Sequence, residues 1–176
     1  MSWEFAFLYG LQSLHCAPLN TIMIFLSTIG NAGIIWILLA VVFLCFPKWR
    51  RCGALMLLSM AVSFILGNLV LKNLIARARP CAIDTTVPLL VKFPREYSFP
   101  SGHTLNGFTA AVMTFLHNRK AGIGALILAA AIAFSRMYLF VHFPTDILGG
   151  MILGIADAVV VYLIVKRIEQ KGKNIC

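Results

Sequence analysis

The chain has 176 residues, of which 60% are hydrophobic and 12% are charged, and its formal net charge at pH 7 is +9. A mean hydropathy of +0.90 excludes an ordinary soluble domain, because so apolar a chain has too little polar surface to face water. The positive charge does not indicate nucleic-acid binding, because the basic residues are spread along the chain and form no single stripe.

The first predicted element is an amphipathic helix within residues 1–19 that lies at the membrane interface. Trp3, Phe7 and Leu11 recur at helical spacing, while the charged Glu4 interrupts the apolar run. A signal peptide would begin with Lys or Arg, and this segment contains neither.

Five transmembrane helices are predicted after this segment, so the fold class is an all-α integral membrane protein with a single membrane-embedded domain. A helix that spans the bilayer needs roughly 20 largely apolar residues. Three segments contain long runs without Asp, Glu, Lys or Arg, and two more are interrupted only by Arg136 and by Asp157. The predicted helices cover residues 20–46, 53–75, 98–117, 121–141 and 145–166, and residues 76–97 form a loop on the outer side.

The basic residues predict the orientation of the helices. With five spans, one side of the membrane receives Lys48, Arg50, Arg51, Arg119, Lys120, Lys166, Arg167, Lys171 and Lys173. This side is predicted to be cytoplasmic, because loops rich in Lys and Arg remain there. The chain is therefore expected to be a multi-pass protein of a cell membrane, with the bacterial plasma membrane as its expected location.

Three polar clusters fall at the outer ends of the predicted spans. They are Lys72 with Arg79-Pro80, then Pro100-Ser101-Gly102-His103, then Ser135-Arg136 with His142 and Asp146. Because one helix runs inward and the next returns between the second and third clusters, all three are expected to meet at one membrane depth. The sequence therefore predicts one pocket that faces the extracytoplasmic side.

The residue types in this pocket indicate phosphoryl transfer. Lys72, Arg79 and Arg136 offer positive charges for phosphate oxygens, and the backbone amides of Ser101, Gly102 and His103 are expected to cradle an anion at the start of a helix. His142, paired with Asp146, is the predicted nucleophile, and His103 is the predicted acid for the leaving oxygen. The cations stabilise the transferring group, so this chemistry requires no metal and no cofactor.

Two other features carry weaker predictions. Cys16 and Cys81 both map to the outer side, and the sequence leaves a disulfide between them open. Asp157 lies within the last span, where an acid is expected to face the bundle interior or a polar partner, and Asn68 and Asn106 are its candidate partners.

The three clusters together resemble the signature of the type 2 phosphatidic acid phosphatase superfamily. The matching pattern is Lys72, six residues, Arg79-Pro80; Pro100-Ser101-Gly102-His103; and Ser135-Arg136, five residues, His142, three residues, Asp146. The resemblance implies a metal-independent membrane phosphatase with His142 as nucleophile, Asp146 as its partner and His103 as the acid. It also implies that Lys72, Arg79, Ser101, Gly102 and Arg136 hold the phosphate. The family is usually described with six membrane helices, whereas five and an interfacial helix are predicted here.

The substrate implied by the resemblance is a lipid phosphate or diphosphate that reaches the site from the bilayer, and undecaprenyl diphosphate is the preferred prediction. Relatives with the same motifs accept phosphatidylglycerol phosphate, phosphatidate, diacylglycerol pyrophosphate or lipid A phosphates. The family also includes vanadium-dependent haloperoxidases, which are larger and soluble, unlike this chain. A lipid-phosphate transporter or a membrane scaffold is the alternative outside enzymology. No nucleic-acid partner is expected, and no oligomeric state is predicted.

Overall fold

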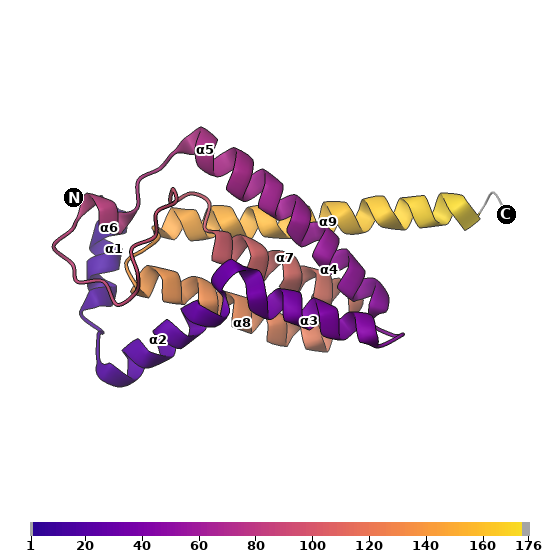
Figure 1. Ribbon diagram of the computed structural model, residues 1–176, viewed down its shortest axis with the longest axis horizontal. Coiled ribbons are helices and arrows are strands. Elements are labelled where there is room, and N and C mark those ends of the chain that lie inside the picture. Colours follow the sequence, from indigo (N-terminus) through magenta and orange to yellow (C-terminus); the bar gives the residue numbers. More distant parts are fainter. Residues whose placement is uncertain (1, 174–176) are drawn as a thin grey trace.

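The computed structural model describes residues 2–173, and this part of the chain contains helices and loops but no strand. The elements run in the order α1 (Trp3–Gln12), α2 (Ala17–Ile29), the 3-10 helix η1 (Asn31–Gly33), α3 (Ile34–Cys45), α4 (Arg50–Ser63), the π-helix η2 (Phe64–Leu71), α5 (Lys72–Ile75), α6 (Pro80–Ile83), α7 (Gly102–His117), α8 (Arg119–Tyr138) and α9 (Pro144–Lys173). They form an elongated bundle in which α9 runs along most of the long axis (Figure 1).

Helix α7 lies at the centre of the bundle and packs most extensively against α8 and α9. Small residues allow this packing, as in other membrane bundles. A Cβ atom at Gly122 would lie 2.2 Å from Phe115 Cα, and one at Gly154 would lie 2.6 Å from Leu105 O. Both contacts are too short for a side chain, so these glycines set the distances of α8 and α9 from α7.

Within the described residues, three helical segments are long and apolar enough to cross a membrane: Arg50–Ile83, Arg119–Tyr138 and Pro144–Gly172. Helix α2 and the segment Asn31–Cys45 pass the same test as one span that is bent by 48°. The class of helical membrane protein is thus confirmed, while five crossings and an interfacial α1 stay predictions. Helix α7 has 16 residues and begins at Gly102, later than the predicted start at residue 98.

The segment predicted as one helix over 20–46 is broken near its middle. Ala32 and Gly33 have positive φ angles of 51° and 71°, which a regular helix does not tolerate. A second irregularity, the π-helix η2, lies in the span that begins with α4. Irregular backbone at membrane depth is tolerated where it lines a cavity, and residues of both η1 and η2 line the cavity described below.

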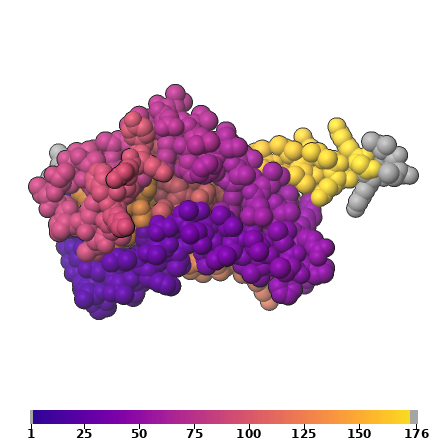
Figure 2. All heavy atoms as spheres, in the orientation of Figure 1, coloured from indigo at the N-terminus to yellow at the C-terminus, as the bar shows by residue number. Residues whose placement is uncertain are grey.

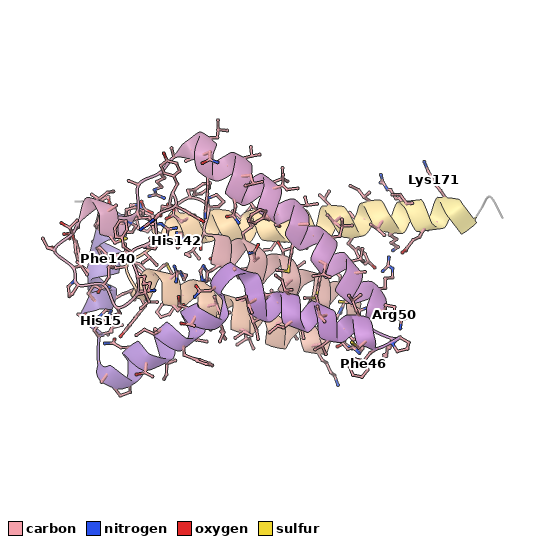
Figure 3. The ribbon with its side chains drawn as sticks, viewed as in Figure 1. His15, Phe46, Arg50, Phe140, His142 and Lys171 are labelled. Atoms are coloured by element: carbon pink, nitrogen blue, oxygen red, sulfur yellow. The ribbon has the colours of Figure 1, made fainter. Side chains whose placement is uncertain are left out.

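The two ends of the bundle differ in chemistry. One end, called the basic end here, carries the α3–α4 turn, the α7–α8 turn and the C-terminal half of α9; Arg50 and Lys171 lie there in Figure 3. His142 lies at the opposite end, called the site end. Helix α1 packs across the site end, where Leu8 and Leu11 join a buried cluster with the segment between α8 and α9.

Two of the weaker sequence predictions can now be answered. Cys16 and Cys81 are both free thiols, so the disulfide that the sequence left open is not formed. Asp157 accepts a hydrogen bond from Ser63 at 2.8 Å, and Ser63 in turn contacts Thr109 at 2.9 Å. The predicted asparagine partners were therefore wrong, because the hydroxyl group of Ser63 on α4 binds this carboxylate.

Candidate active site

A cavity of about 730 Å³ opens at the site end of the bundle. Its walls come from α2 and η1, from η2 and α5, from the loop that follows α6, and from α7 and α8. In Figure 2 the mouth is visible as a hollow between that loop and α2. A cavity of this size accepts the head group of a lipid and leaves room for the start of its chain.

All three sequence clusters contribute to this cavity. The predicted site residues that line it are Lys72, Arg79, Gly102, His103, Arg136 and His142. Ser101 and Asp146 lie behind them and are fully buried. The fold thus produces the predicted convergence at one depth. Helix α5, the start of α7, the end of α8 and the start of α9 all lie near this cavity.

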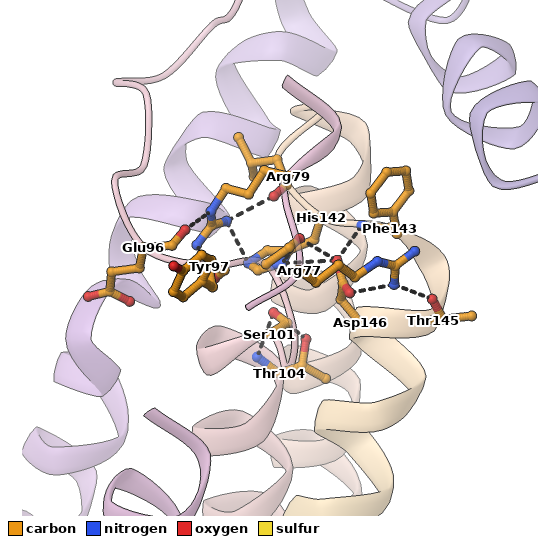
Figure 4. Close-up of polar contacts among 12 residues, drawn as sticks. Arg77, Arg79, Glu96, Tyr97, Ser101, Thr104, His142, Phe143, Thr145 and Asp146 are labelled. Carbon is orange, nitrogen blue, oxygen red and sulfur yellow. Dashed lines mark hydrogen bonds and ion pairs between the residues drawn. The ribbon is translucent and has the colours of Figure 1, made fainter. Parts of the chain in front are cut away.

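His142 lies in the loop between α8 and α9, and its two ring nitrogens have different partners (Figure 4). Its Nδ1 is 3.5 Å from Asp146 Oδ2, and its Nε2 is 3.1 Å from Arg79 Nη1. A guanidinium can only donate, so Nε2 accepts and Nδ1 carries the proton. The free lone pair of the ring is therefore on Nε2, beside Arg79.

The environment keeps His142 neutral. Burial lowers the pKa of His142 because it disfavours the imidazolium, and the charges of Arg79 and Arg136 lower it further. The hydrogen bond to Asp146 acts in the opposite direction and raises it. A neutral imidazole beside arginine is a nucleophile that needs no prior deprotonation.

Asp146 is held by several donors at the start of α9. Its Oδ2 accepts from the Phe143 backbone amide at 2.8 Å and from Ser98 Oγ at 2.5 Å. These bonds fix the carboxylate at the N-terminus of a long helix, where a negative charge is favoured. Asp146 can therefore orient His142 and stabilise a positive charge on its ring.

Three cations that line the pocket are almost completely buried, with exposed fractions of 6% for Lys72, 5% for Arg79 and 6% for Arg136. Arg79 donates to the backbone oxygens of Glu96 at 2.7 Å and Tyr97 at 3.2 Å. Buried cations with donors of this kind suit an anion with several oxygens.

Glu96, in the loop that follows α6, contacts two of the buried cations. Lys72 forms an ion pair with the carboxylate of Glu96, whose backbone oxygen also contacts Arg79. Arg136 donates to Ser27 Oγ, and its buried Nε has no hydrogen-bond partner within residues 2–173. The oxygen atoms of Glu96 thus occupy donors of Lys72 and Arg79 that a bound phosphate group would need.

His103 lies in the first turn of α7 and also has a defined proton position. Its Nε2 is 3.0 Å from Asn31 Oδ1 and 3.2 Å from the Ser27 backbone oxygen. Both partners are acceptors, so Nε2 carries a proton. A protonated nitrogen that lines the cavity is what the predicted acid needs.

The backbone amide of Ser101 is arranged differently from the predicted anion cradle. Ser101 caps α7, but its backbone amide donates to Asp146 O at 3.1 Å and its hydroxyl accepts from Thr104 Oγ1 at 3.0 Å. These contacts turn Ser101 away from the cavity and toward α9. Gly102 does line the cavity, where a Cβ atom would lie 3.2 Å from Asn68 Oδ1 and 3.9 Å from Lys72 Nζ.

Sequence reasoning missed several residues behind the site. Arg77 donates to Asp146 Oδ1 at 2.7 Å and to Glu4 Oε2 at 2.6 Å. Asn31 faces His103, and Ser98 binds Asp146. Glu4 and Arg77 are 73 positions apart in the sequence, so no spacing rule joins them.

The helical membrane fold and the cation-lined pocket with two histidines are those expected of a membrane phosphatase. Similarity to solved structures agrees with this expectation. A crystal structure described as a transmembrane PAP2 type phosphatidylglycerolphosphate phosphatase from Bacillus subtilis superposes with a TM-score of 0.75 at 29% identity, over 93% of this chain and 84% of that one. The LpxE structure from Aquifex aeolicus gives a TM-score of 0.80 at 22% identity, over 92% of this chain and 96% of that one, and shows the fold alone.

The chain belongs to the PAP2 superfamily, whose profile matches residues 53–170. An undecaprenyl-diphosphatase of Sulfolobus acidocaldarius is 36% identical over 78% of this chain and 66% of its own length. Phosphatidylglycerophosphatase B of Bacillus subtilis is 32% identical over 89% of this chain and 78% of its own length. The chain thus spans just under two thirds of the first relative and more than three quarters of the second.

Proposed function

We propose that this chain is a metal-independent lipid phosphatase that works through a phosphohistidine at His142. The observation that carries the proposal is the pair of contacts at His142: Nδ1 faces Asp146, and Nε2 faces the cavity beside Arg79. Nucleophile, orienting carboxylate and phosphate-binding cations are thereby joined at one point.

In the first step, the lone pair of His142 Nε2 attacks the terminal phosphorus and the bond from phosphorus to the leaving oxygen breaks. Lys72, Arg79 and Arg136 would bind the equatorial oxygens and offset the charge of the transferring group. His103 enters this step as an imidazolium: its Nε2 proton moves to the leaving oxygen and the ring becomes neutral, so the lipid product departs without an added negative charge. The products are a phosphohistidine and the lipid without its terminal phosphate.

In the second step, water hydrolyses the phosphohistidine. His103, now neutral, takes a proton from the water, and the oxygen attacks phosphorus as the P–N bond breaks. The electron pair of that bond returns to His142 Nε2, and Asp146 stabilises the imidazolium character that develops during transfer. Inorganic phosphate leaves, and His103 again carries the proton that it needs for the next cycle.

A polyprenyl diphosphate such as undecaprenyl diphosphate is the proposed substrate. The name of the first relative supports it. The cavity supports it too, because Lys92 and Arg95 line it in addition to the three buried cations and can meet the charge of a second phosphate. Phosphatidylglycerol phosphate, for which the second relative is named, is the alternative substrate with direct support.

The site is proposed to face the extracytoplasmic side. The basic end carries the α3–α4 and α7–α8 turns together with the end of α9, and the site lies at the other end. The excess of Lys and Arg at the basic end favours its retention in the cytoplasm. Lipid carriers that are dephosphorylated outside the cytoplasm would meet the site directly.

The test is inorganic phosphate release by detergent-purified protein in the presence of a chelator. Undecaprenyl diphosphate, phosphatidylglycerol phosphate, phosphatidate and a lipid A phosphate are compared, with His142→Ala as the control. We expect the highest kcat/KM with undecaprenyl diphosphate and no release by the variant. No release from any lipid would contradict the enzyme and favour a transporter or scaffold, whose activity the alanine variant would retain.

A further inference from the structure

The carboxylate of Asp146 has two oxygens, and only Oδ2 faces His142. Oδ1 accepts from Arg77 at 2.7 Å. The other end of the Arg77 guanidinium donates to Glu4 of α1 at 2.6 Å. Asp146 is therefore joined to the N-terminal helix through one arginine, at a position that the family signature leaves unspecified.

Helix α1 also holds the residue that precedes Asp146. Glu4 Oε1 accepts from Thr145 Oγ1 at 2.6 Å and from its backbone amide at 3.3 Å. Arg77 lies over the Phe143 ring, 4.2 Å from its centroid. Glu4 and Arg77 thus contact the turn on both sides of Pro144, where α9 begins.

These contacts are shielded from water. The exposed side-chain fractions are 27% for Arg77, 13% for Glu4 and zero for Asp146. Hydrogen-bonded charge pairs that are mostly buried hold their partners in a well-defined geometry. Removing one partner of such a pair lowers the stability of the protein. Such an arrangement can fix the angle at which Asp146 meets His142.

We propose that Arg77 and Glu4 are positioning residues that orient Asp146 toward His142 and balance its charge. Helix α1 then contributes to catalysis as well as covering the site end. The inference rests on the proposed function, because the consequence of losing either residue is read from the phosphatase reaction. Neither residue lines the cavity, so neither is expected to bind the substrate.

The charges around His142 predict opposite effects of the two residues. The charged and titratable groups that act on His142 directly are Arg79, Arg136, His103 and Asp146. Arg77 pairs with Asp146, and Glu4 pairs with Arg77. Removing Arg77 takes away a positive charge, which makes protonation of His142 easier. Removing the charge of Glu4 leaves Arg77 unbalanced, which makes protonation harder.

The experiment compares Arg77→Gln, Arg77→Lys and Glu4→Gln, with Arg51→Gln as the matched control. Arg51 forms a comparable ion pair with Glu169 at 2.7 Å, but at the basic end. We expect Arg77→Gln and Glu4→Gln to lower kcat about tenfold with KM within about twofold, far less than the roughly 10⁴-fold loss when an orienting carboxylate is itself replaced. Arg77→Lys should recover part of kcat, and the control should equal the wild type.

A second readout does not depend on turnover. NMR titration of protein with isotope-labelled histidine, in micelles, measures the protonation midpoint of His142 in each variant. The midpoint should rise in Arg77→Gln and fall in Glu4→Gln, whereas a merely structural role would move neither in this opposed manner. Unchanged midpoints together with unchanged kcat would overturn the inference. Wild-type protein that releases no phosphate would instead contradict the proposed function, and the midpoints would still decide this inference.

Discussion

Replacing Glu96 by Gln should make the enzyme bind its substrate more tightly. Glu96 pairs with Lys72, so its negative charge lies beside the ammonium group that a phosphate oxygen would bind. The hydrogen bond from Lys72 and its charge hold the pKa of Glu96 below its ordinary value, so the carboxylate is charged at neutral pH and competes with phosphate.

The size of the effect follows from exposure. The Glu96 side chain is 72% exposed and the Lys72 side chain 7%. A pair with one partner so exposed contributes about 0.2–1 kcal/mol, so its loss should lower KM by a factor of about 1.4 to 5. The effect should shrink as salt is added, because exposed charges are screened.

Steady-state phosphate release measures this directly. We expect Glu96→Gln to lower KM with kcat within about twofold of the wild type, while Glu169→Gln, at the ion pair of the basic end, changes neither constant. A higher KM in Glu96→Gln would refute the reasoning, because it would mean that the carboxylate contributes to substrate binding.

Three further predictions concern the cations, the pH profile and the orientation. Arg136→Lys should lower kcat/KM by at least about tenfold in the same assay, because an ammonium group cannot replace the planar fork; unchanged kinetics would contradict a phosphate contact. Since the pKa of His142 is lowered, its neutral form persists as pH falls through 6.5, so the acid limb of kcat/KM, corrected for substrate ionisation, should lie below that value. A His142 limb at 6.5 would contradict this environment. In intact cells, in a background without native cysteines, Arg95→Cys should react with a membrane-impermeant thiol reagent and Lys171→Cys should not; the reverse pattern would place the site in the cytoplasm.

The site clusters were predictable because each is short in sequence. The intervals from Lys72 to Arg79 and from His142 to Asp146 fit within a few turns of chain, and the charge-free runs between clusters fix which membrane side they share. Lining of the cavity by His103, Arg136 and His142 is the result.

The surroundings of the site were not predictable in the same way. Glu4 was interpreted only as a break in an amphipathic pattern, and its contact with Arg77 arises from tertiary packing of α1 on the site end. Likewise, the pairing of Lys72 with Glu96 depends on the path of an irregular loop. A single charged residue forms no periodic pattern, so the sequence does not indicate which distant residue pairs with it.

The hydropathy pattern also gave no indication of where the helices bend. The break at Ala32 and Gly33 lies inside a charge-free run, where an apolar average is the same for a straight and a bent span. The π-helix η2 is similarly apolar. Both irregular segments line the cavity, so features that a hydropathy profile averages away form part of its walls.

The most direct test of the central claim is capture of the phosphohistidine. Purified protein is mixed with undecaprenyl diphosphate labelled with ³²P in its terminal phosphate, quenched with alkali within one turnover, and digested for mass spectrometry. The account predicts an alkali-stable, acid-labile phosphoryl group on the peptide that contains His142, and none in His142→Ala. Turnover by the wild type without this label, or with the label on another residue, would contradict it.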